Sequence, residues 1–486
     1  MSDTKKIALI PLDNRPVCYS LPEQIADINT NIQLFLPPRE FLGGLTTYAN
    51  IGKIFEWVKT ITNENKIDSI VISLDTIAYG GLVASRRVTS KKEEVMKKLT
   101  HLLEIINYNE HKPKIFCLSS IMRISNNNVN EEEKEYWDKY GKLIFEYSYY
   151  LHKFSLGYTD DETETIENLF AQIPDNIIND YLKTRQRNYE VNRFYINWIK
   201  NQEIDYLVFC QDDTAKFGLN VSEGLDLAEM CLGENAQVKT GADEIPTCLL
   251  SRAIVDREIK IHPVFTTKNG KDIVSRYEDK TIFNSTVDQI TLCGGKFVDN
   301  KEDADMFLVV NTPNKEQNDH CMKAYNDDTC EEGIRFCEEI LSTTNKPVIV
   351  ADISHANGGD DKLVRKVLLN HLNNPMLYGY AGWNTTGNTL GSAISTGIIK
   401  YLAIQDNTYN EDAFKKLLMV RIADDWAYQT VVRQKIRAVE DVADKKILNE
   451  EMKVYIQKIA EELGIEHSHI KFSYPWNRTF EVEVGV

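Results

Sequence analysis

The sequence has no long hydrophobic run. No stretch of about 18 consecutive apolar residues occurs in the 486 residues, and a membrane-spanning helix needs about that many. The first residues, MSDTKKIALIPL, also lack the extended apolar segment of a secretory signal peptide. These absences predict a cytoplasmic protein without a membrane partner.

Positive charge is scarce. Lys and Arg number 56 against 73 Asp and Glu, which gives a formal net charge of −17. A protein this acidic repels nucleic-acid phosphates and anionic lipid headgroups. We therefore expect no nucleic-acid partner.

Cysteine and histidine occur, but not in the patterns of disulfides or zinc sites. The nine cysteines are odd in number and none forms Cys-x-x-Cys, which favours reduced, buried thiols. His-Glu-x-x-His is absent. So are the dinucleotide-binding Gly-x-Gly-x-x-Gly, the P-loop and the serine-hydrolase elbow Gly-x-Ser-x-Gly. We therefore expect no cofactor in the preferred function.

Short apolar runs recur along the chain, most of them followed by helical patterning, which is typical of buried strands in a parallel sheet. Ten are predicted as strands: 7–12, 32–36, 69–74, 114–118, 204–210, 237–243, 260–265, 306–311, 347–352 and 376–379. This alternation predicts an α/β fold. Our preferred architecture is a TIM-barrel-like core of largely parallel strands, and the alternative is two doubly wound α/β domains.

Two other regions differ from this alternation. Residues from about 126 to 201 are polar, aromatic and helical in pattern, which predicts a helical insertion. From about 401 the sequence becomes helical and charge-rich and closes with a short strand-like tail. We predict a catalytic core over 1–400 and a helical C-terminal extension over 401–486.

Acidic side chains follow several of the predicted strands. The carboxyl ends of parallel strands share one rim, where ligands gather in α/β folds. Paired carboxylates there suit glycoside hydrolysis by acid/base catalysis, or a site for a divalent cation. The acids at these positions are Asp13, Asp75, Asp212, Asp213, Asp243, Glu244 and Asp352.

The segment Thr240-Gly-Ala-Asp243-Glu244 is similar to the Gly-Gly-Asp-Glu signature of β-hexosaminidases. The resemblance implies that Glu244 is the general acid and that Asp243 orients a substrate acetamido group. The family carries His two residues before the signature, where this sequence has Lys239.

Arginines and glycine-rich loops add candidate binding residues. Arg15, Arg86 and Arg123 follow strand ends or turns, and arginine offers a bidentate grip on an anion or on the rim acids. Glycines beside polar side chains allow a backbone to approach a ligand closely. Two such loops supply Asp352, His355 and Asn357, then Trp383, Asn384 and Asn388.

Four blocks resemble a family of bacterial proteins, domain-of-unknown-function family 4127. They are PLDNRPV from Pro11, YGGLVASR from Tyr79, GADE from Gly241 and AGWNTxGN from Ala381. They extend from residue 11 to about residue 391, so the resemblance implies one unit over most of the chain and no settled activity. The loop from Ala351 to Gly359 is also similar to a loop of the microcystinase C metallopeptidases, without its proline and third glycine.

We predict a glycoside hydrolase acting on a small sugar or N-acetylhexosaminide. Asp243 and Glu244 would polarise the substrate and transfer the proton, and Asp212 and Asp213 would supply the second carboxylate. The remaining rim and loop residues would bind substrate: Asp13, Arg15, Asp75, Arg86, Arg123, Asp352, Asn357, Trp383, Asn384 and Asn388.

Two alternatives remain open. One is a metal-dependent hydrolase of an amide or phosphate ester, with Asp212, Asp213, Asp352 and His355 as ligands of a divalent metal. The other is a non-enzymatic protein that binds a sugar or nucleotide through the same loops. The sequence leaves the oligomeric state undetermined.

Overall fold

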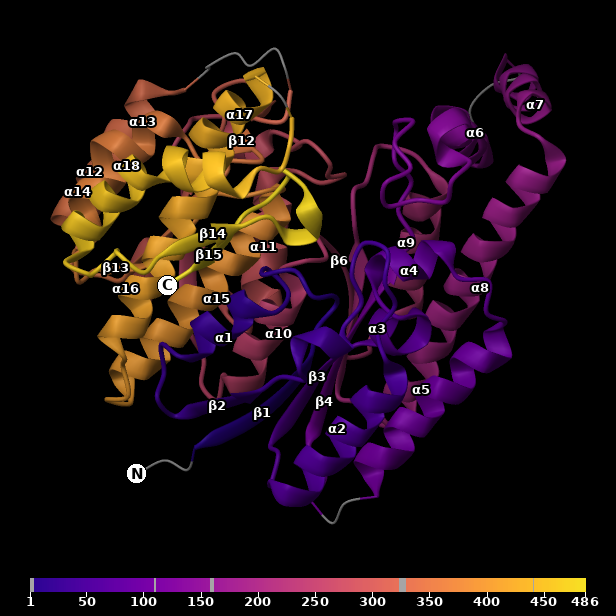
Figure 1. Ribbon diagram of the computed structural model, residues 1–486, viewed down its shortest axis with the longest axis horizontal. Coiled ribbons are helices and arrows are strands. Elements are labelled where there is room, and N and C mark those ends of the chain that lie inside the picture. The colour runs from indigo at the N-terminus through magenta and orange to yellow at the C-terminus, as the bar shows by residue number, and fades with distance from the viewer. Residues whose placement is uncertain (1–3, 109–110, 158–160, 323–328, 440) are drawn as a thin grey trace.

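The first half of the chain forms a six-stranded parallel sheet (Figure 1). The computed structural model describes residues 4–108, 111–157, 161–322, 329–439 and 441–486. The strands, in spatial order, are β2 (Ile32–Phe35), β1 (Lys5–Ile10), β3 (Ser69–Ser73), β4 (Lys114–Ile121), β5 (Tyr206–Gln211) and β6 (Ala236–Thr240). Every neighbouring pair is parallel.

The second half forms a five-stranded parallel sheet with the same winding. Its strands, in spatial order, are β13 (Leu377–Ala381), β11 (Val348–Asp352), β9 (Met306–Asn311), β7 (Lys260–Phe265) and β8 (Lys296–Phe297). In each sheet the first strand in the chain lies between the second and the third. This is the order of flavodoxin-like doubly wound sheets, which bind ligands beyond their carboxyl strand ends.

The predicted α/β class with parallel strands is therefore confirmed, and each of the ten predicted strands overlaps a strand of these two sheets. The strands are divided between two sheets, as in the alternative prediction. A closed TIM barrel is not confirmed.

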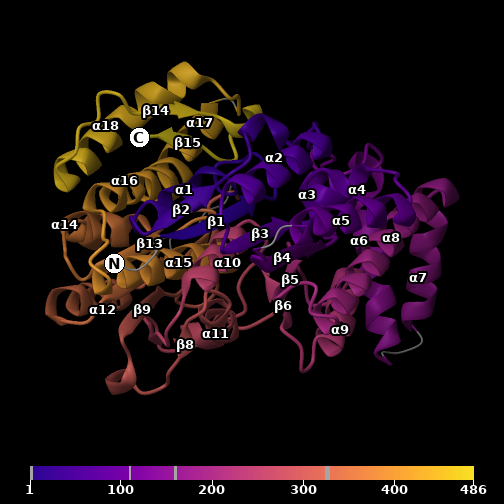
Figure 2. The same cartoon turned by 90° about the horizontal axis from the view of Figure 1, so that it is seen from below.

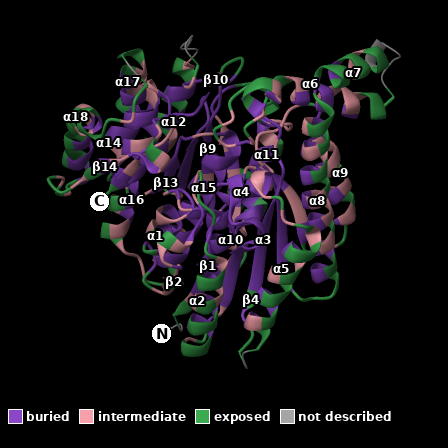
Figure 3. Ribbon diagram, turned by 45° about the vertical axis from the view of Figure 1, so that its right-hand side comes forward, coloured by how far each residue is buried: buried purple, intermediate pink, exposed green. Residues whose placement is uncertain are grey.

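Helices join the two sheets into one body (Figures 1 and 2). One face of the first sheet is covered by α2 (Ile51–Glu64), α3 (Leu74–Tyr79), α5 (Lys92–Asn107) and α8 (Asp175–Lys200). Between the sheets lie α1 (Ser20–Ala26), α10 (Ile245–Ile254), α11 (Ile282–Leu292) and α15 (Thr386–Gln405). One continuous apolar cluster runs through this layer, and in Figure 3 the strands and helix α15 are coloured mainly as buried.

The remaining elements are short or peripheral. They are α4 (Leu82–Arg87), α9 (Leu219–Met230), β10 (Asn318–Asp319), α12 (Glu331–Thr343), β12 (His355–Ala356), α13 (Asp361–Leu363), a π-helical turn (Val364–Leu368) and α14 (Leu369–His371), with 3₁₀ turns at Arg39–Phe41, Gly270–Asp272, Lys301–Asp303 and Pro475–Asn477.

The predicted helical insertion is present, but it begins later than expected. Its helices are α6 (Trp137–Ser155), α7 (Asp161–Gln172) and α8. Residues 126–136 contain no helix, which corrects the prediction for that stretch. The carboxylates of Glu132 and Glu133 accept hydrogen bonds from Arg123 instead, which holds this segment as a loop.

The C-terminal region is helical and ends in a hairpin. It comprises α16 (Glu411–Arg421), the π-helix η5 (Ile422–Val432), α17 (Arg433–Val439), α18 (Lys445–Leu463) and the antiparallel pair β14 (Lys471–Ser473) and β15 (Glu483–Gly485). Helix α15 passes without a break across the predicted boundary at 400/401. The division of the chain into domains stays a prediction.

The glycines of the two predicted ligand loops pack against protein instead. A Cβ on Gly359 would lie 2.5 Å from the Tyr380 hydroxyl, and one on Gly382 would lie 2.8 Å from it. A Cβ on Gly391 would lie 2.5 Å from Cγ of Glu244. These glycines allow helices and loops to approach each other closely, so close approach to a ligand is not needed to explain them.

We expect Gly391→Ala to destabilise the protein. The added methyl group would overlap Glu244 and the Cys248 sulfur, 2.7 Å away, at the contact of α10 with α15. Overpacking of this kind costs about 1–3 kcal/mol of unfolding free energy, which urea denaturation would measure. Gly52→Ala is the matched control, because its Cβ meets only Asn50 Oδ1 at 3.7 Å. A loss no greater than that of the control would contradict close packing at Gly391.

Candidate functional site

Two neighbouring cavities open where the carboxyl strand ends of the two sheets meet the C-terminal region. The larger, called the cleft below, has a volume of about 510 Å³, and the smaller, called the slot, has about 30 Å³. Asn357, Asn384 and Phe480 line both. The cleft has the size of a small-molecule site, whereas the slot has room for one or two waters.

Backbone strain concentrates at the cleft. Among the described residues, positive φ angles occur at the non-glycine positions Gln202, Asp213, Tyr277, Asn357, Asn384, Asn407, Trp476 and Asn477. Five of these eight line the cleft: Asp213, Tyr277, Asn357, Asn384 and Asn477. Left-handed conformations at such residues are costly and gather at functional sites, so their distribution favours the cleft as the binding site.

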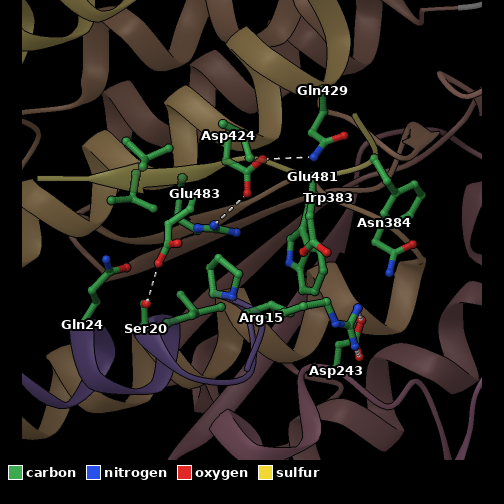
Figure 4. Close-up of a pocket in the computed structure, with 18 of the residues that line it drawn as sticks. Arg15, Ser20, Gln24, Asp243, Trp383, Asn384, Asp424, Gln429, Glu481 and Glu483 are labelled. Atoms are coloured by element: carbon green, nitrogen blue, oxygen red, sulfur yellow. Dashed lines mark hydrogen bonds and ion pairs between the residues drawn. The ribbon is translucent and has the colours of Figure 1, made fainter. Parts of the chain in front are cut away.

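Arg15 connects the loop after β1 with the loop after the edge strand β6. Its Nε and Nη2 donate to Asp13, two residues earlier, at 2.7–3.1 Å. Its Nη1 and Nη2 donate to Asp243, after β6, at 3.0 and 2.6 Å. The loops after β1 and β6 thus meet through one buried guanidinium. Arg15 and Asp243 form the floor of the slot (Figure 4).

Arg123, after β4, connects the acids of the cleft. Its Nη1 donates to Asp213 at 3.1 Å, and its Nη2 donates to Glu132 at 2.9 Å. The neighbouring Asp212 accepts from the buried Arg86 at 2.7 Å. Arg123 also lies 3.7 Å from Asp212, so the adjacent Asp212 and Asp213 share Arg123 while Arg86 contacts Asp212.

The C-terminal segment completes the wall between the cavities. Trp476 lies between two guanidiniums, with Arg15 and Arg478 each 4.8 Å from its ring centroid. Its indole N–H donates to Asn14 at 2.7 Å. Arg478 also donates to Glu132 at 2.7 Å. Residues 476–484 are therefore held to the first sheet by cation–π contacts and an ion pair.

Two carboxyl groups of the cleft differ sharply in acidity. Desolvation, and then the charge of Asp212, raise the pKa of Asp213 to about 7, although 36% of its side chain is exposed. Burial also opposes ionisation of Glu132, but Arg123, Arg86 and Arg478 outweigh it and hold its pKa well below the usual range. Near neutral pH the cleft thus presents one carboxyl group that titrates, Asp213, and one that stays ionised, Glu132.

Burial also opposes ionisation of the acids that line the slot. Burial raises the pKa of Glu481 to about 8 against the opposing charge of Arg15, and it raises that of Asp243. Burial likewise raises the pKa of Asp424 in η5, which accepts from Gln429 at 3.0 Å. Figure 4 shows these side chains around the slot. Its small volume leaves the cleft as the larger space for a substrate.

Glu244 lies away from both cavities. It is fully buried, its two oxygens accept from Gln289 at 2.9 Å and Asn388 at 2.5 Å, and burial raises its pKa to about 8. A carboxyl group enclosed between α10 and α15 cannot reach a substrate. The predicted roles of Glu244 as general acid and Asn388 as substrate ligand are corrected to a buried hydrogen bond that joins these helices.

Other predicted binding residues are also internal. Asp75 accepts from Ser120 N at 2.7 Å, and Asp352 accepts from Asn311 and from Asp360 N at 2.8 and 2.7 Å. Both are buried, and neither lines a cavity. Asp13 and Arg86 line neither the cleft nor the slot. They contact the site indirectly, Asp13 through Arg15 and Arg86 through Asp212. Arg15, Arg123, Asp213, Asp243, Asn357, Trp383 and Asn384 line the cleft or the slot.

The predicted metal ligands are not brought together. Among the described residues, the potential ligands that lie mutually within 4.8 Å are Asp13, Cys18 and Asp243. Arg15 already donates hydrogen bonds to the carboxylates of Asp13 and Asp243. His355 is buried instead beside His320, with their ring centroids 4.9 Å apart.

Several residues at the site escaped the sequence analysis. Glu131 and Glu132 stand in the stretch that was predicted to be helical, and Arg478 and Glu481 stand in the C-terminal tail. The Pro-Trp-Asn-Arg run from Pro475 was the available indication, because an exposed tail rarely needs Trp beside Arg.

Comparisons with known proteins identify the family. Residues 7–485 match the family described as "Protein of unknown function (DUF4127)". The chain belongs to the DUF4127 family. This confirms the resemblance found in the sequence and extends it to the C-terminal hairpin.

No curated protein matches this DUF4127 chain. One similar solved structure is the anaerobic ribonucleotide reductase from Thermotoga maritima with citrate in the active site, at 10% identity, covering 86% of this chain and 72% of the reductase. Its TM-score of 0.22 is too low to support an inference about fold or function. No helix in the described part of the chain could span a membrane.

We expect Arg15→Met to destabilise this DUF4127 protein by about 3–5 kcal/mol, because it leaves Asp13 and Asp243 as buried unpaired charges. Arg15 opposes the rise that burial causes in the pKa of Asp243, so without Arg15 that pKa would rise further. The loss should therefore be larger at pH 8 than at pH 5, where Asp243 can take up a proton. Urea denaturation at the two pH values would test this.

Arg39→Met is the matched control for that experiment. Arg39 pairs with Glu483 while 33% of its side chain stays exposed, so its loss should cost about 0–1 kcal/mol. Equal effects of the two variants, or a deficit in Arg15→Met that does not vary with pH, would contradict the proposed role of Arg15.

Proposed function

We propose that this protein is a glycoside hydrolase that uses carboxylate acid/base chemistry on a small sugar bound in the cleft. The observation that carries the proposal is the pairing of Asp213 and Glu132 on Arg123. Groups whose environments push their pKa values apart are typical of an acid/base pair. An N-acetylhexosaminide is the first substrate to test.

Exposure separates Asp213 from three buried acids whose pKa is raised to a similar value. Asp75, Asp352 and Asp425 have pKa values of about 7, 7 and 8, but each is at most 1% exposed. Asp213 has a pKa of about 7 with 36% of its side chain exposed to the cleft. A general acid must reach the leaving-group oxygen, and Asp213 satisfies that requirement.

The lining of the cleft suits a hydroxyl-rich ligand. Amide and hydroxyl side chains both donate and accept hydrogen bonds, as sugar hydroxyls do. Those in the cleft come from Ser125, Asn127, Tyr277, Asn357, Asn384, Asn477 and Thr479. Phe480 adds an aromatic face between the cleft and the slot.

The proposed proton transfer uses the groups around Arg123. Asp213 in its protonated form gives its proton to the glycosidic oxygen as the bond to the sugar breaks. The carboxylate left behind is stabilised by Arg123 at 3.1 Å, which offsets its repulsion from Asp212. The ionised Glu132 stays on the same guanidinium and favours the positive charge that develops on the sugar. Water then adds to the sugar cation and returns a proton to the Asp213 carboxylate, which completes the hydrolysis.

We expect Asp213→Asn to lower kcat on chromogenic N-acetylhexosaminides by about 10²–10⁴-fold, because the amide cannot donate the proton. Steady-state assays of purified protein would measure this. Asp441→Asn, in the same cleft with 57% of its side chain exposed, should stay close to wild type. Equal activity of Asp213→Asn and wild type would contradict the assignment of Asp213 as the general acid. Ligand binding without turnover across a broad glycoside panel would favour the non-enzymatic alternative.

The pH profile of kcat/KM should show a descending limb at about pH 7. Asp213 must hold its proton, so kcat/KM should be level below its pKa and fall as pH rises through it. The limb should vanish in Asp213→Asn. A rate that instead rises through pH 7 would assign Asp213 as a base.

Removal of metal should leave the activity unchanged. The proposed chemistry uses carboxyl groups alone. In the cluster of Asp13, Cys18 and Asp243, both carboxylates already accept hydrogen bonds from Arg15. Dialysis against EDTA followed by assay, with and without added Mn²⁺ or Zn²⁺, would check this. Loss of activity that is restored by either ion would favour the metal-dependent hydrolase.

A further inference from the structure

A separate basic pocket lies on the helical face of the first sheet, away from the cleft. Its volume is about 370 Å³, and its walls include Tyr48, Tyr79, Arg87, Ser90 and Lys98. It forms where the segment before α2 meets α3, the end of α4 and the middle of α5, which lie together in Figure 1.

Two cations line this pocket and a third lies beside it, behind Tyr79, and none of the three has a carboxylate partner among the described residues. They are Arg87 and Lys98 in the wall and Arg187 of α8, whose guanidinium lies 4.9 Å from the centroid of the Tyr79 ring. In the described part of the chain no carboxylate is at ion-pair distance from any of them. The nearest acids, Glu94, Glu133 and Asp180, act only at longer range.

Backbone carbonyls hold these cations in place. Arg87 donates to the carbonyls of Leu45 and Glu133, both at 2.9 Å, and Lys98 donates to that of Ala78 at 3.1 Å. Carbonyl oxygens satisfy the N–H groups but carry no formal charge, so the positive charge is not neutralised. By contrast, Arg15, Arg86 and Arg123 at the cleft are all paired with carboxylates.

We propose that this pocket binds the phosphate or sulfate group of a small organic anion. Three positive charges held together in a protein of net charge −17 form a site that selects for a compact, highly charged anion. The Lys98 ammonium and the Ser90 hydroxyl supply donors. Tyr48, which is 59% exposed, offers a flat face to the organic part of the ligand.

The pocket is connected to the cleft through one arginine. Arg87 also donates to the carbonyl oxygens of Asn130 and Glu131 at 3.3 and 2.5 Å. The loop that it holds presents Glu131 and Glu132 to the cleft. An anion bound beside Arg87 therefore acts on the position of that loop.

Isothermal titration of the full chain at constant ionic strength would test the site. The probes are inorganic phosphate, glucose 6-phosphate and glucose. We expect saturable binding of the two phosphates and none of glucose. Lys98→Gln should weaken phosphate binding by at least about tenfold, because it removes a charged donor. Lys97→Gln, which alters an exposed neighbour on α5, is the matched control.

Each outcome of the titration either supports or contradicts the proposed anion site. Glucose 6-phosphate binding that is tighter than phosphate and weakened by Tyr48→Ala supports an organic phosphate, and equal binding supports the free anion. Asp213→Asn should bind phosphate as the wild type does, so a failed glycosidase assay leaves this test intact. No saturable binding, equal loss in Lys98→Gln and Lys97→Gln, or loss in Asp213→Asn would overturn the proposal.

Discussion

The site depends on the balance of buried charge between carboxylates and arginines. Arg15 has at most 7% of its side chain exposed and is paired with both Asp13 and Asp243. Ionised groups are stable in such surroundings only when they are paired, so each guanidinium fixes the loops that carry its partners. The same constraint makes the geometry of the cleft rigid, because Arg123 and Arg478 hold its acids in the same way.

This balance explains why the acids of one rim differ so much in character. Glu132 is surrounded by arginines and stays ionised, whereas desolvation and the charge of Asp212 raise the pKa of Asp213 to about 7. Neither acidity is a property of Glu or Asp as a residue type. Both follow from the number of cations within reach and from how much solvent remains.

The sequence predicted the strands well, because they are short apolar runs and the central ones are buried on both faces, as Tyr206–Gln211 is. It placed Asp213 and Arg123 at strand ends for the same reason. It could not show that Glu244 faces inwards, since Glu244 and Asp243 are adjacent and only the turn into α10 separates their directions. Glu132 and Arg478 were missed because 346 positions separate them in the chain, and only the fold brings them together.

The contact of Trp476 with Asn14 joins residues 462 positions apart. Because the wall of the cleft includes residues 477–480, no growing chain can hold a finished cleft until that segment has left the ribosome. The first sheet can form its hydrogen bonds long before then, since domains tend to fold in the order of their synthesis. Its strand-end acids and arginines can pair with one another while they are still in water, and the docking of the last hairpin would then desolvate them together.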